Sequence, residues 1–403
     1  VLYTTGSTGP AKATLYPHRN FCEITRIAHR SWSFQPGEVP VDMPAFPAFS
    51  FIALSAGGTV VVPPINFAFE GPADARPDQI VEVINDCGVR SMFASPALLR
   101  NLGQYAARTG ARTPSLKRVI GGGAPIVASI MEPLLEMMGE GATVCANYGA
   151  TEALPSTELE AAEALAETWP LTEQGHGICV GRPFEGVEIR IIAISDEPMG
   201  SIDEARELPT GEIGEIVIHG GHVSPAYCRD EQNTRKHKID DGEGGVWHRI
   251  GDAGYFDEKG RLWYCGRVSQ RVCAPGGAVY SLLAEPIFNT HSKVARSGLV
   301  GVLVDGAEVP VICIETTPGV RRSELPALRE ELLELARRHA VTSQIRTLLF
   351  KDKLPVDPRH NSKIERPRLA RWARARVTRP GAPLPAGKAG VPATGNLESR
   401  SGA

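Results

Sequence analysis

Short runs of β-branched residues alternate with amphipathic helical patterns along the first 138 residues, and this alternation constrains the fold more than any other feature. Strands that end in turns are predicted at 59–64, 89–95 and 118–123. Helices with apolar residues at intervals of three and four are predicted at 78–88, 96–108 and 125–138. Strands that alternate with helices favour a largely parallel sheet with both faces covered. The first part of the chain is therefore predicted to be α/β.

Past the last of these helices the pattern changes to short strands. From 187 to 266, strand-like runs are separated by turns of Gly and Asp, as in a mostly β layer. The segment "DEKG" at 257–260 has the composition of a hairpin turn. Past Arg267 a smaller unit is expected, with strands at 297–304 and 309–316.

The C-terminal part has two further features. A helix is predicted from Ser323 to Ala340, because its leucines recur at intervals of three and four and form one face. These leucines are Leu325, Leu328, Leu332 and Leu335. From about Thr378 the sequence is Pro, Gly, Ala and Ser with few large apolar residues, which predicts a disordered tail.

The composition excludes some classes of function. The chain has 403 residues and a net charge of −3, so no broad electropositive face for nucleic acid or an anionic membrane surface is expected. No signal peptide is expected, and the sequence has no apolar run of the ~18 residues that a membrane helix needs.

The cysteines and histidines do not form a metal-binding pattern. Eight cysteines are scattered without C-x-x-C spacing, which favours reduced thiols in a cytoplasmic protein over disulfides or a zinc site. His219 and His222 could bind a metal together, but no cysteine or acidic ligand accompanies them. We therefore favour their interpretation as loop histidines.

The chain opens on a loop of Gly, Ser, Thr and Lys that could bind phosphate. A Walker A loop is excluded, because Ala11 and Ala13 occupy the positions of its second Gly and its Ser/Thr. The remaining glycines, hydroxyls and lysine could still surround a polyphosphate, and an ordinary turn is the alternative. The residues concerned are Thr5, Gly6, Ser7, Thr8, Gly9 and Lys12.

Two further clusters follow predicted strands. In "GGGAP" at 121–125, missing side chains would let a flat ring lie against the backbone, although a simple glycine-rich turn has the same composition. In "NYGATEA" at 147–153, an aromatic ring, a hydroxyl and a carboxylate would suit a nucleotide base, a phosphate and Mg²⁺. This second cluster is expected to form a loop after a strand at 142–146.

Two charged residues complete the set of candidates. Asp252 follows a strand-like run in the segment 246–272, where its carboxylate could accept hydrogen bonds from both ribose hydroxyls, and Arg267 lies near the end of that segment. Lys363 lies in a polar turn before a basic helix, and a solvated lysine near the chain end is the alternative interpretation.

In their order along the chain, these clusters resemble the motifs of the adenylate-forming superfamily, which comprises acyl-CoA ligases, nonribosomal adenylation domains and luciferases. The resemblance runs from Val1 to about Trp372. It implies an α/β fold with a large adenylation domain at 1–267, built of covered sheets plus a β layer and incomplete at its start. It also implies a small α+β lid domain at 268–376, and the disordered tail then occupies 377–403.

The resemblance also implies a role for each matching residue. The residues that match the mobile phosphate loop are Thr5, Gly6, Ser7, Thr8, Gly9 and Lys12. Those that match the adenine platform are Gly122, Gly123, Ala124 and Pro125. In the motif that contains Gly149, Tyr148 matches the residue that stacks on adenine. Thr151 matches an α-phosphate contact, and Glu152 matches the Mg²⁺ ligand.

The remaining matches lie toward the C-terminus. Asp252 matches the ribose-binding aspartate and Arg267 the arginine near the hinge. Lys363 matches the lid lysine that bridges the substrate carboxylate and the α-phosphate during adenylation. The implied cofactors are ATP and Mg²⁺, and the implied catalytic residues are Lys363, Thr151 and Glu152.

Departures from the common pattern narrow the choice within the superfamily. The phosphate loop reads G-P-A-K-A, the stretch 43–51 lacks the histidine of many acyl-CoA ligases, and the hinge position is Gln270 instead of Asp or Lys. The segments "YGATEALP", "IFNTH" and "LPVDPRHNSKI" resemble those of the β-lactone synthetases of bacterial olefin biosynthesis. That group implies adenylation of a long-chain 2-alkyl-3-hydroxy fatty acid, which closes to a β-lactone with release of AMP and PPi.

Two alternatives stay open. The first is a fatty acyl-CoA ligase or fatty acyl-AMP ligase, and only this alternative uses CoA. The second is an inactive nucleotide-binding fragment, because Val1 is not a methionine and members of the superfamily carry a substantial segment before the phosphate loop. The expected partner is a small-molecule acyl substrate, together with association with other biosynthetic enzymes in the cytoplasm.

Overall fold

The structure, a computed structural model, describes residues 1–4, 10–31, 39–67, 71, 74–356 and 364–377. Several predictions fall outside these ranges, namely those for Thr5 to Gly9, Lys363 and the tail from Thr378.

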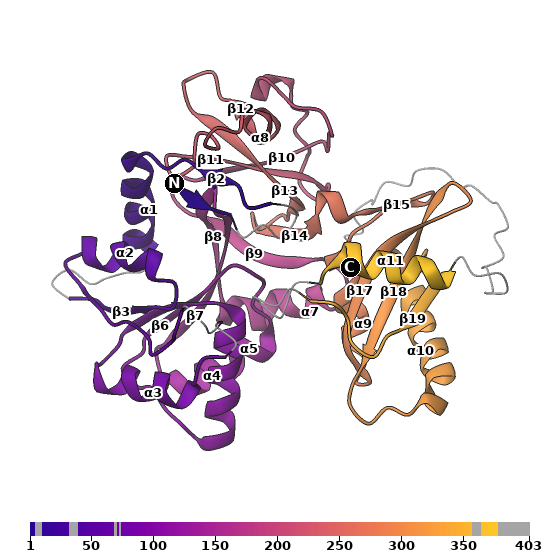
Figure 1. Ribbon diagram of the computed structural model, residues 1–403, viewed down its shortest axis with the longest axis horizontal. Coiled ribbons are helices and arrows are strands. Elements are labelled where there is room, and N and C mark those ends of the chain that lie inside the picture. The colour runs from indigo at the N-terminus through magenta and orange to yellow at the C-terminus, as the bar shows by residue number, and fades with distance from the viewer. Residues whose placement is uncertain (5–9, 32–38, 68–70, 72–73, 357–363, 378–403) are drawn as a thin grey trace, which may run out of the picture.

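A mixed sheet of twelve strands forms the larger part of the protein (Figure 1). One half is parallel, in the order β7-β6-β5-β3-β4. Its strands are β3 (Val41–Pro44), β4 (Thr59–Val60), β5 (Ser91–Ala94), β6 (Arg118–Gly121) and β7 (Thr143–Ala150). The predicted parallel α/β arrangement is confirmed, and the strands predicted at 59–64, 89–95 and 118–123 correspond to β4, β5 and β6.

Helices cover both faces of the parallel half. The three predicted helices form on one face as α3 (Pro77–Asp86), α4 (Pro96–Thr109) and α5 (Ala128–Met138). The helices on the other face are α1 (His18–Ser31) and α2 (Ser50–Ser55). Val119 packs with the first set and its neighbour Ile120 packs with the second, because successive side chains of β6 point to opposite faces.

The antiparallel half continues the same sheet in the order β10-β11-β13-β14-β9-β8, and β8 pairs with β7. Its strands are β8 (Ala153–Glu160), β9 (Ile178–Pro183), β10 (Glu188–Ile192), β11 (Gly214–His219), β13 (Val246–Phe256) and β14 (Leu262–Arg267). A short strand, β12 (Lys238–Asp240), pairs with β13 and follows α8 (Glu231–His237). The predicted β layer is therefore the second half of one continuous sheet.

Two predicted boundaries are wrong. The cluster at 147–153 was expected to be a loop after 142–146, but β7 continues to Ala150, because β8 pairs with it as far as Ala150↔Ala153. Asp252 lies inside β13 instead of after a strand, directly after Gly251, whose φ of +76° favours glycine. Both motifs are therefore held by strand pairing.

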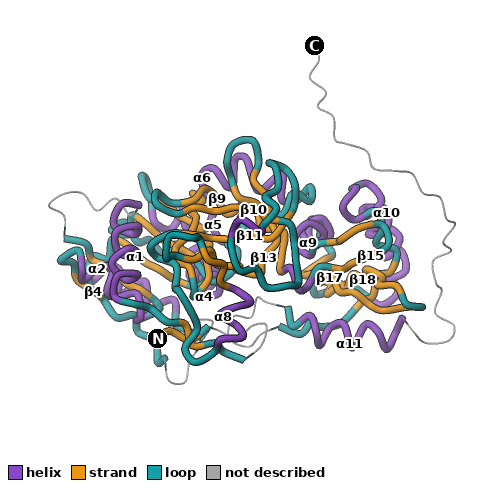
Figure 2. Tube along the Cα trace, turned by 90° about the horizontal axis from the view of Figure 1, so that it is seen from above, coloured by secondary structure: helices purple, strands orange, loops and turns teal. Residues whose placement is uncertain are grey.

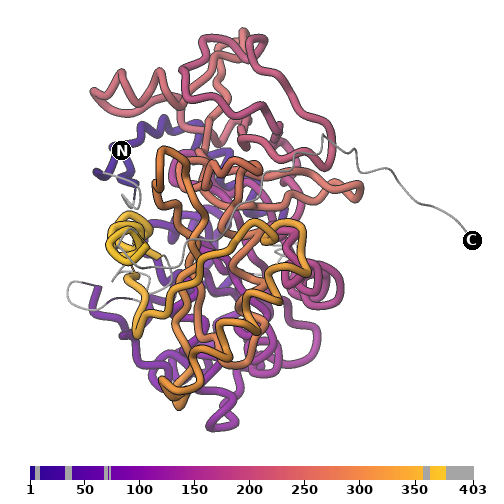
Figure 3. Tube along the Cα trace, turned by 90° about the vertical axis from the view of Figure 1, so that its right-hand side faces the viewer, coloured from indigo at the N-terminus to yellow at the C-terminus, as the bar shows by residue number. Residues whose placement is uncertain are grey.

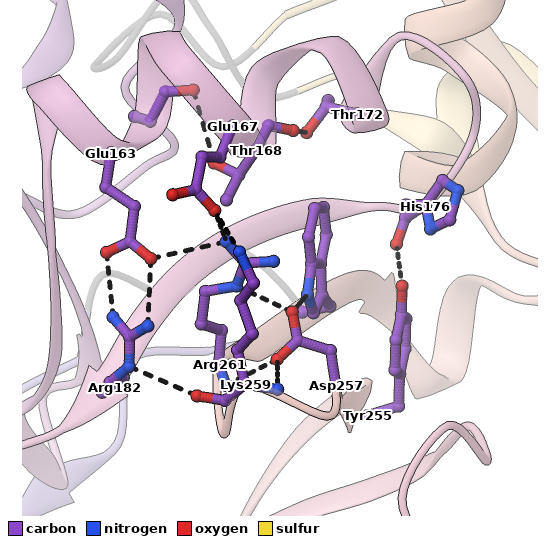
Figure 4. A network of polar contacts seen from close by, with 12 residues as sticks. Glu163, Glu167, Thr168, Thr172, His176, Arg182, Tyr255, Asp257, Lys259 and Arg261 are labelled. Atoms are coloured by element: carbon purple, nitrogen blue, oxygen red, sulfur yellow. Dashed lines mark hydrogen bonds and ion pairs between the residues drawn. The ribbon is translucent and has the colours of Figure 1, made fainter.

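A network of charged side chains ties the β13–β14 hairpin to a helical segment at 161–172 (Figure 4). This segment comprises α6 (Ala161–Glu163), a π-helical stretch (Ala164–Thr168) and α7 (Trp169–Thr172). Arg261 is buried and lies 2.7 Å from Asp257, 3.0 Å from Glu167 and 3.4 Å from Glu163. The turn at 257–260 between the two strands confirms the predicted hairpin.

We expect Arg261→Met to lower the free energy of unfolding by about 2–3 kcal/mol, since charge-assisted hydrogen bonds to partly buried carboxylates would be lost. Urea denaturation at constant pH measures the change. Lys259→Met is the control, because Lys259 pairs with Glu167 while its side chain is 59% exposed, and it should cost less than about 1 kcal/mol. Equal costs for the two variants would contradict a central role for Arg261.

A smaller unit lies at the C-terminal end, built on a three-stranded sheet (Figure 3). Its strands are β17 (Val294–Val304), β18 (Ala307–Thr316) and β19 (Thr347–Phe350). The hairpin β15 (Val272–Ala274) and β16 (Gly277–Val279) precedes α9 (Ser281–Asn289). The strands predicted at 297–304 and 309–316 thus lie within β17 and β18.

The small sheet is also covered on both faces. Leu299 and Ile312 pack with α9 and α10 (Leu325–Arg338), whereas Val300 and Val311 pack with α11 (Arg366–Val377). Figure 2 shows α10 and α11 on opposite sides of β17 and β18. The predicted helix at 323–340 is confirmed as α10, and the basic helix predicted after Lys363 is α11.

Short elements complete the description. A two-stranded pair, β1 (Leu2–Tyr3) and β2 (Ala13–Thr14), brackets the opening loop. Within the described residues, no helix combines the length and the apolar character needed to cross a membrane.

Candidate active site

The structure brings Tyr148, Asp252 and Arg267 together from three different strands. The Tyr148 hydroxyl donates a 2.8 Å hydrogen bond to Asp252 Oδ2, and Arg267 Nη1 forms a 2.9 Å ion pair with Asp252 Oδ1. Asp252 and Arg267 are direct partners in the β13–β14 pairing. The buried Asp252 carboxylate raises the pKa of Arg267, so the guanidinium stays charged at neutral pH.

The glycine-rich turn at 122–125 lies beside the strand that carries Tyr148. A Cβ at Gly122 would lie 3.7 Å from the carbonyl oxygen of Asn147 and 3.1 Å from the ring of Phe93. Gly123 has a φ of +86°, which other residues rarely adopt. Of the predicted platform residues Gly122, Gly123, Ala124 and Pro125, the first leaves little room for a side chain and the second has a backbone conformation that favours glycine.

Glu152 lies in the tight turn between β7 and β8, where contacts from other segments hold it. The hydroxyl of Tyr16 donates to the carbonyl of Thr151 at 2.5 Å, and Ser224 N donates to the carbonyl of Glu152 at 2.9 Å. The Glu152 side chain is buried, and its Oε1 accepts a 2.5 Å hydrogen bond from the hydroxyl of Tyr227. Neither Tyr16 nor Tyr227 belongs to a predicted motif.

Lys12 contacts the same tyrosine, Tyr227, as Glu152 does. The backbones of Thr4 and Lys12 close the base of the opening loop, since Thr4 N donates to the carbonyl of Lys12 at 2.9 Å. The ammonium of Lys12 lies 4.9 Å from the centroid of the Tyr227 ring. Burial lowers the pKa of Lys12, and the Glu152 carboxylate opposes this shift. Lys12, Tyr227 and Glu152 thus form one local cluster.

A second lysine, Lys238, lies behind this cluster and was not predicted. Its Nζ is buried without a hydrogen-bond partner in the described part of the chain and lies 5.8 Å from the Tyr227 ring centroid. Burial lowers the pKa of Lys238 to about 7, while the Glu152 carboxylate raises it. The sequence carries no signal for this residue, because Lys238 stands in the polar run "RKHKIDD" at 235–241.

The two histidines of "HGGH" lie in different surroundings. His219 ends β11, hydrogen-bonds to Asp241 at 2.9 Å and stacks on Trp247. His222 is fully buried, and burial lowers its pKa to about 4. Among the described residues, no group of three or more His, Cys, Asp or Glu side chains could hold a metal ion.

The sequence comparisons decide the family. The family of AMP-binding enzymes matches residues 1–228 of this chain. The chain belongs to the AMP-binding enzyme family. An olefin β-lactone synthetase of Stenotrophomonas maltophilia is 39% identical over 381 residues, which cover 94% of this chain and 67% of that protein. A second olefin β-lactone synthetase, from Xanthomonas campestris, is 38% identical and is covered to 66%.

Solved structures of AMP-binding enzymes have the same fold. An amide bond synthetase from Marinactinospora thermotolerans superposes with a TM-score of 0.70 at 25% identity, over 91% of this chain and 68% of that one. The O-succinylbenzoate coenzyme A synthetase of Bacillus subtilis, in complex with ATP and magnesium ion, gives 0.69 at 23% identity over 91% and 69%. This chain therefore spans about two thirds of the length of the relatives that it matches.

The predicted hinge residue of this AMP-binding enzyme, Gln270, is part of a partly buried polar cluster. Its Oε1 accepts a 3.0 Å hydrogen bond from Nε of Arg366 at the start of α11. Arg366 also pairs with both carboxylate oxygens of Glu285 in α9 and donates to the carbonyl of Leu299 at 2.8 Å. The segment after β14 is thus bonded to the core of the C-terminal unit.

Proposed function

We propose that this chain is the larger part of an ATP-dependent olefin β-lactone synthetase, which adenylates a long-chain 2-alkyl-3-hydroxy fatty acid. Membership of the AMP-binding enzyme family and the two relatives named olefin β-lactone synthetase support this proposal. The observation that carries its ATP-dependent part is a pair of clusters. The first joins Glu152, in the β7–β8 turn, to Lys12. The second joins Tyr148 of β7 to Asp252 and Arg267.

Each cluster suits one end of ATP. The Asp252 carboxylate, paired with Arg267, can accept hydrogen bonds from ribose hydroxyls, and the glycines at 122–123 leave space for a flat base. Lys12 supplies a cation for the phosphates. We assign the hydroxyl of Thr151 to the α-phosphate and Lys363 to the substrate carboxylate, and Lys363 lies outside the described residues.

Glu152 fits the requirements of Mg²⁺. Its Oε2 has no hydrogen-bond partner among the described residues, and no cage of acidic side chains surrounds it. Magnesium is usually held by one or two carboxylates together with substrate phosphates, so a single carboxylate is sufficient. Bound there, Mg²⁺ would neutralise charge on the polyphosphate.

The proposed reaction has two steps. A carboxylate oxygen of the acid attacks the α-phosphorus of ATP, and pyrophosphate leaves, which forms the acyl adenylate. The 3-hydroxyl oxygen of the same molecule then attacks the acyl carbon, loses its proton, and displaces AMP to close the four-membered ring. The second step is intramolecular, so no thiol is needed, and a high effective molarity favours it.

The decisive experiment omits CoA. We expect the protein, supplied with ATP, Mg²⁺ and a long-chain 2-alkyl-3-hydroxy acid, to release AMP and form a β-lactone, which mass spectrometry identifies. The same acid without its 3-hydroxyl should yield acyl adenylate but no lactone. Turnover that strictly requires CoA would instead support a fatty acyl-CoA ligase. A chain that binds ATP without turnover would support the inactive-fragment alternative.

The environment of the enzyme is also a proposal. All eight cysteines are free, which is consistent with our assignment of the protein to the cytoplasm. The acid is the proposed small-molecule partner, and we further propose association with other biosynthetic enzymes.

A further inference from the structure

Glu152 depends on contacts from a segment far along the chain. Tyr227 is 3% exposed and donates its hydroxyl hydrogen to Oε1 of Glu152, which is itself 7% exposed. This hydrogen bond is charge-assisted and joins two buried groups, and burial strengthens such bonds. One carboxylate oxygen is therefore fixed by the protein, and the other has no hydrogen-bond partner among the described residues.

Backbone pairing holds Tyr227 in place. Cys228 N donates to the carbonyl of Ala13 at 2.7 Å, and Tyr227 N donates to Oγ1 of Thr234 at 3.1 Å. Tyr227 also forms an isolated bridge with Thr14, the second residue after Lys12. The strand that follows Lys12 is thus the same strand that fixes the backbone of Tyr227.

Lys238 lies near the same ring, 5.8 Å from its centroid. It is 7% exposed, and its Nζ has no hydrogen-bond partner within the described ranges. A buried ammonium is costly unless an anion compensates it. Burial lowers the pKa of Lys238 to about 7, and the Glu152 carboxylate favours the charged form. Lys12 and Lys238 both lie within 6 Å of the Tyr227 ring, at 4.9 and 5.8 Å from its centroid.

We propose that Tyr227 and Lys238 are positioning residues for Glu152, holding one carboxylate oxygen and offsetting its charge so that the other oxygen is reserved for the cation of MgATP. This inference rests on the proposed function, in which Glu152 binds that cation. Groups that support a metal ligand typically fix its orientation, and their loss weakens metal binding by about 10- to 100-fold.

The test measures binding of MgATP, of ATP in EDTA, and of AMP by calorimetry. Tyr227→Phe removes only the hydroxyl, so we expect about tenfold weaker MgATP binding and unchanged binding of AMP and of magnesium-free ATP. Lys238→Met should act in the same direction. Matched controls are Tyr255→Phe, which loses a hydroxyl bonded to the carbonyl of His176, and Lys236→Met, an exposed lysine two residues from Lys238.

Several results would overturn the inference. If Tyr227→Phe weakens the binding of AMP as much as the binding of MgATP, Tyr227 is a packing residue. If the binding of MgATP is unchanged in this variant, Tyr227 has no role in it. In a Glu152→Gln background, Tyr227→Phe should cause no further loss, and an additional tenfold loss would contradict an effect through Glu152. If Lys238→Met does not fold, Tyr227→Phe alone decides.

A different result would contradict the proposed function itself. Wild-type protein that binds ATP equally with and without Mg²⁺ would overturn the cation role of Glu152, and this inference with it. The variant results above overturn the inference alone, because they leave magnesium-dependent binding by the wild type in place.

Discussion

Glu152→Gln is expected to lower the rate of adenylation on the order of 100- to 1,000-fold, as the loss of a single preorganised electrostatic group often does. The amide keeps the size of the side chain and can still accept the hydrogen bond of Tyr227. It removes, however, the negative charge that favours the protonated forms of Lys12 and Lys238. Affinity for the cation of the nucleotide should fall as well.

Exchange of labelled pyrophosphate into ATP, driven by the acid substrate, measures this step separately from ring closure. Glu160→Gln is the control, because Glu160 is an exposed carboxylate at the end of β8. A rate for Glu152→Gln within a few fold of wild type, with the control unchanged, would remove Glu152 from the reaction.

A second large effect is expected on acidification. Burial lowers the pKa of three histidines, to about 4 for His222 and His237 and well below its usual range for His248. In the unfolded chain these rings bind a proton near pH 6.5, so between pH 6.5 and 4 the unfolded state binds more protons. Their contribution to stability is therefore fully present above pH 6.5 and is lost as the pH falls toward 4.

For His222, which is fully buried, the shift corresponds to about 3 kcal/mol. Urea denaturation at several pH values from 7 to 4.5 measures the loss. His222→Met should remove the part of the pH dependence of the unfolding free energy that His222 causes, since methionine binds no proton. Equal slopes for wild type and His222→Met would refute the assignment.

The regular elements could be predicted because each carries its own pattern. Leu328 and Leu332 recur on one face of α10 and are buried in the structure. The ends of strands that are set by pairing with another strand could not be predicted in this way. The extension of β7 to Ala150 comes from its pairing with β8, and the position of Asp252 inside β13 comes from its pairing with β11 and β14.

The residues of the candidate site also divide into those that the sequence indicates and those that it does not. Motif order along the chain indicates Tyr148, Glu152 and Asp252, because their residue types and spacing are unusual for a bland loop. Tyr227 and Lys238 carry no such signal, since an isolated tyrosine or lysine is common. Their contact with Glu152 arises only when the segment at 226–228 pairs with β2 at the other end of the sequence.

The cluster of Gln270, Glu285 and Arg366 has a practical consequence for protein engineering. These three residues come from the segment after β14, from α9 and from α11, and their hydrogen bonds join them into a single unit. A C-terminal unit transplanted from a relative would therefore have to bring all three residues with it. The junction between the two proteins should lie before Val268. A junction after Gln270 would leave the native Gln270 beside the residue that the relative supplies in place of Arg366.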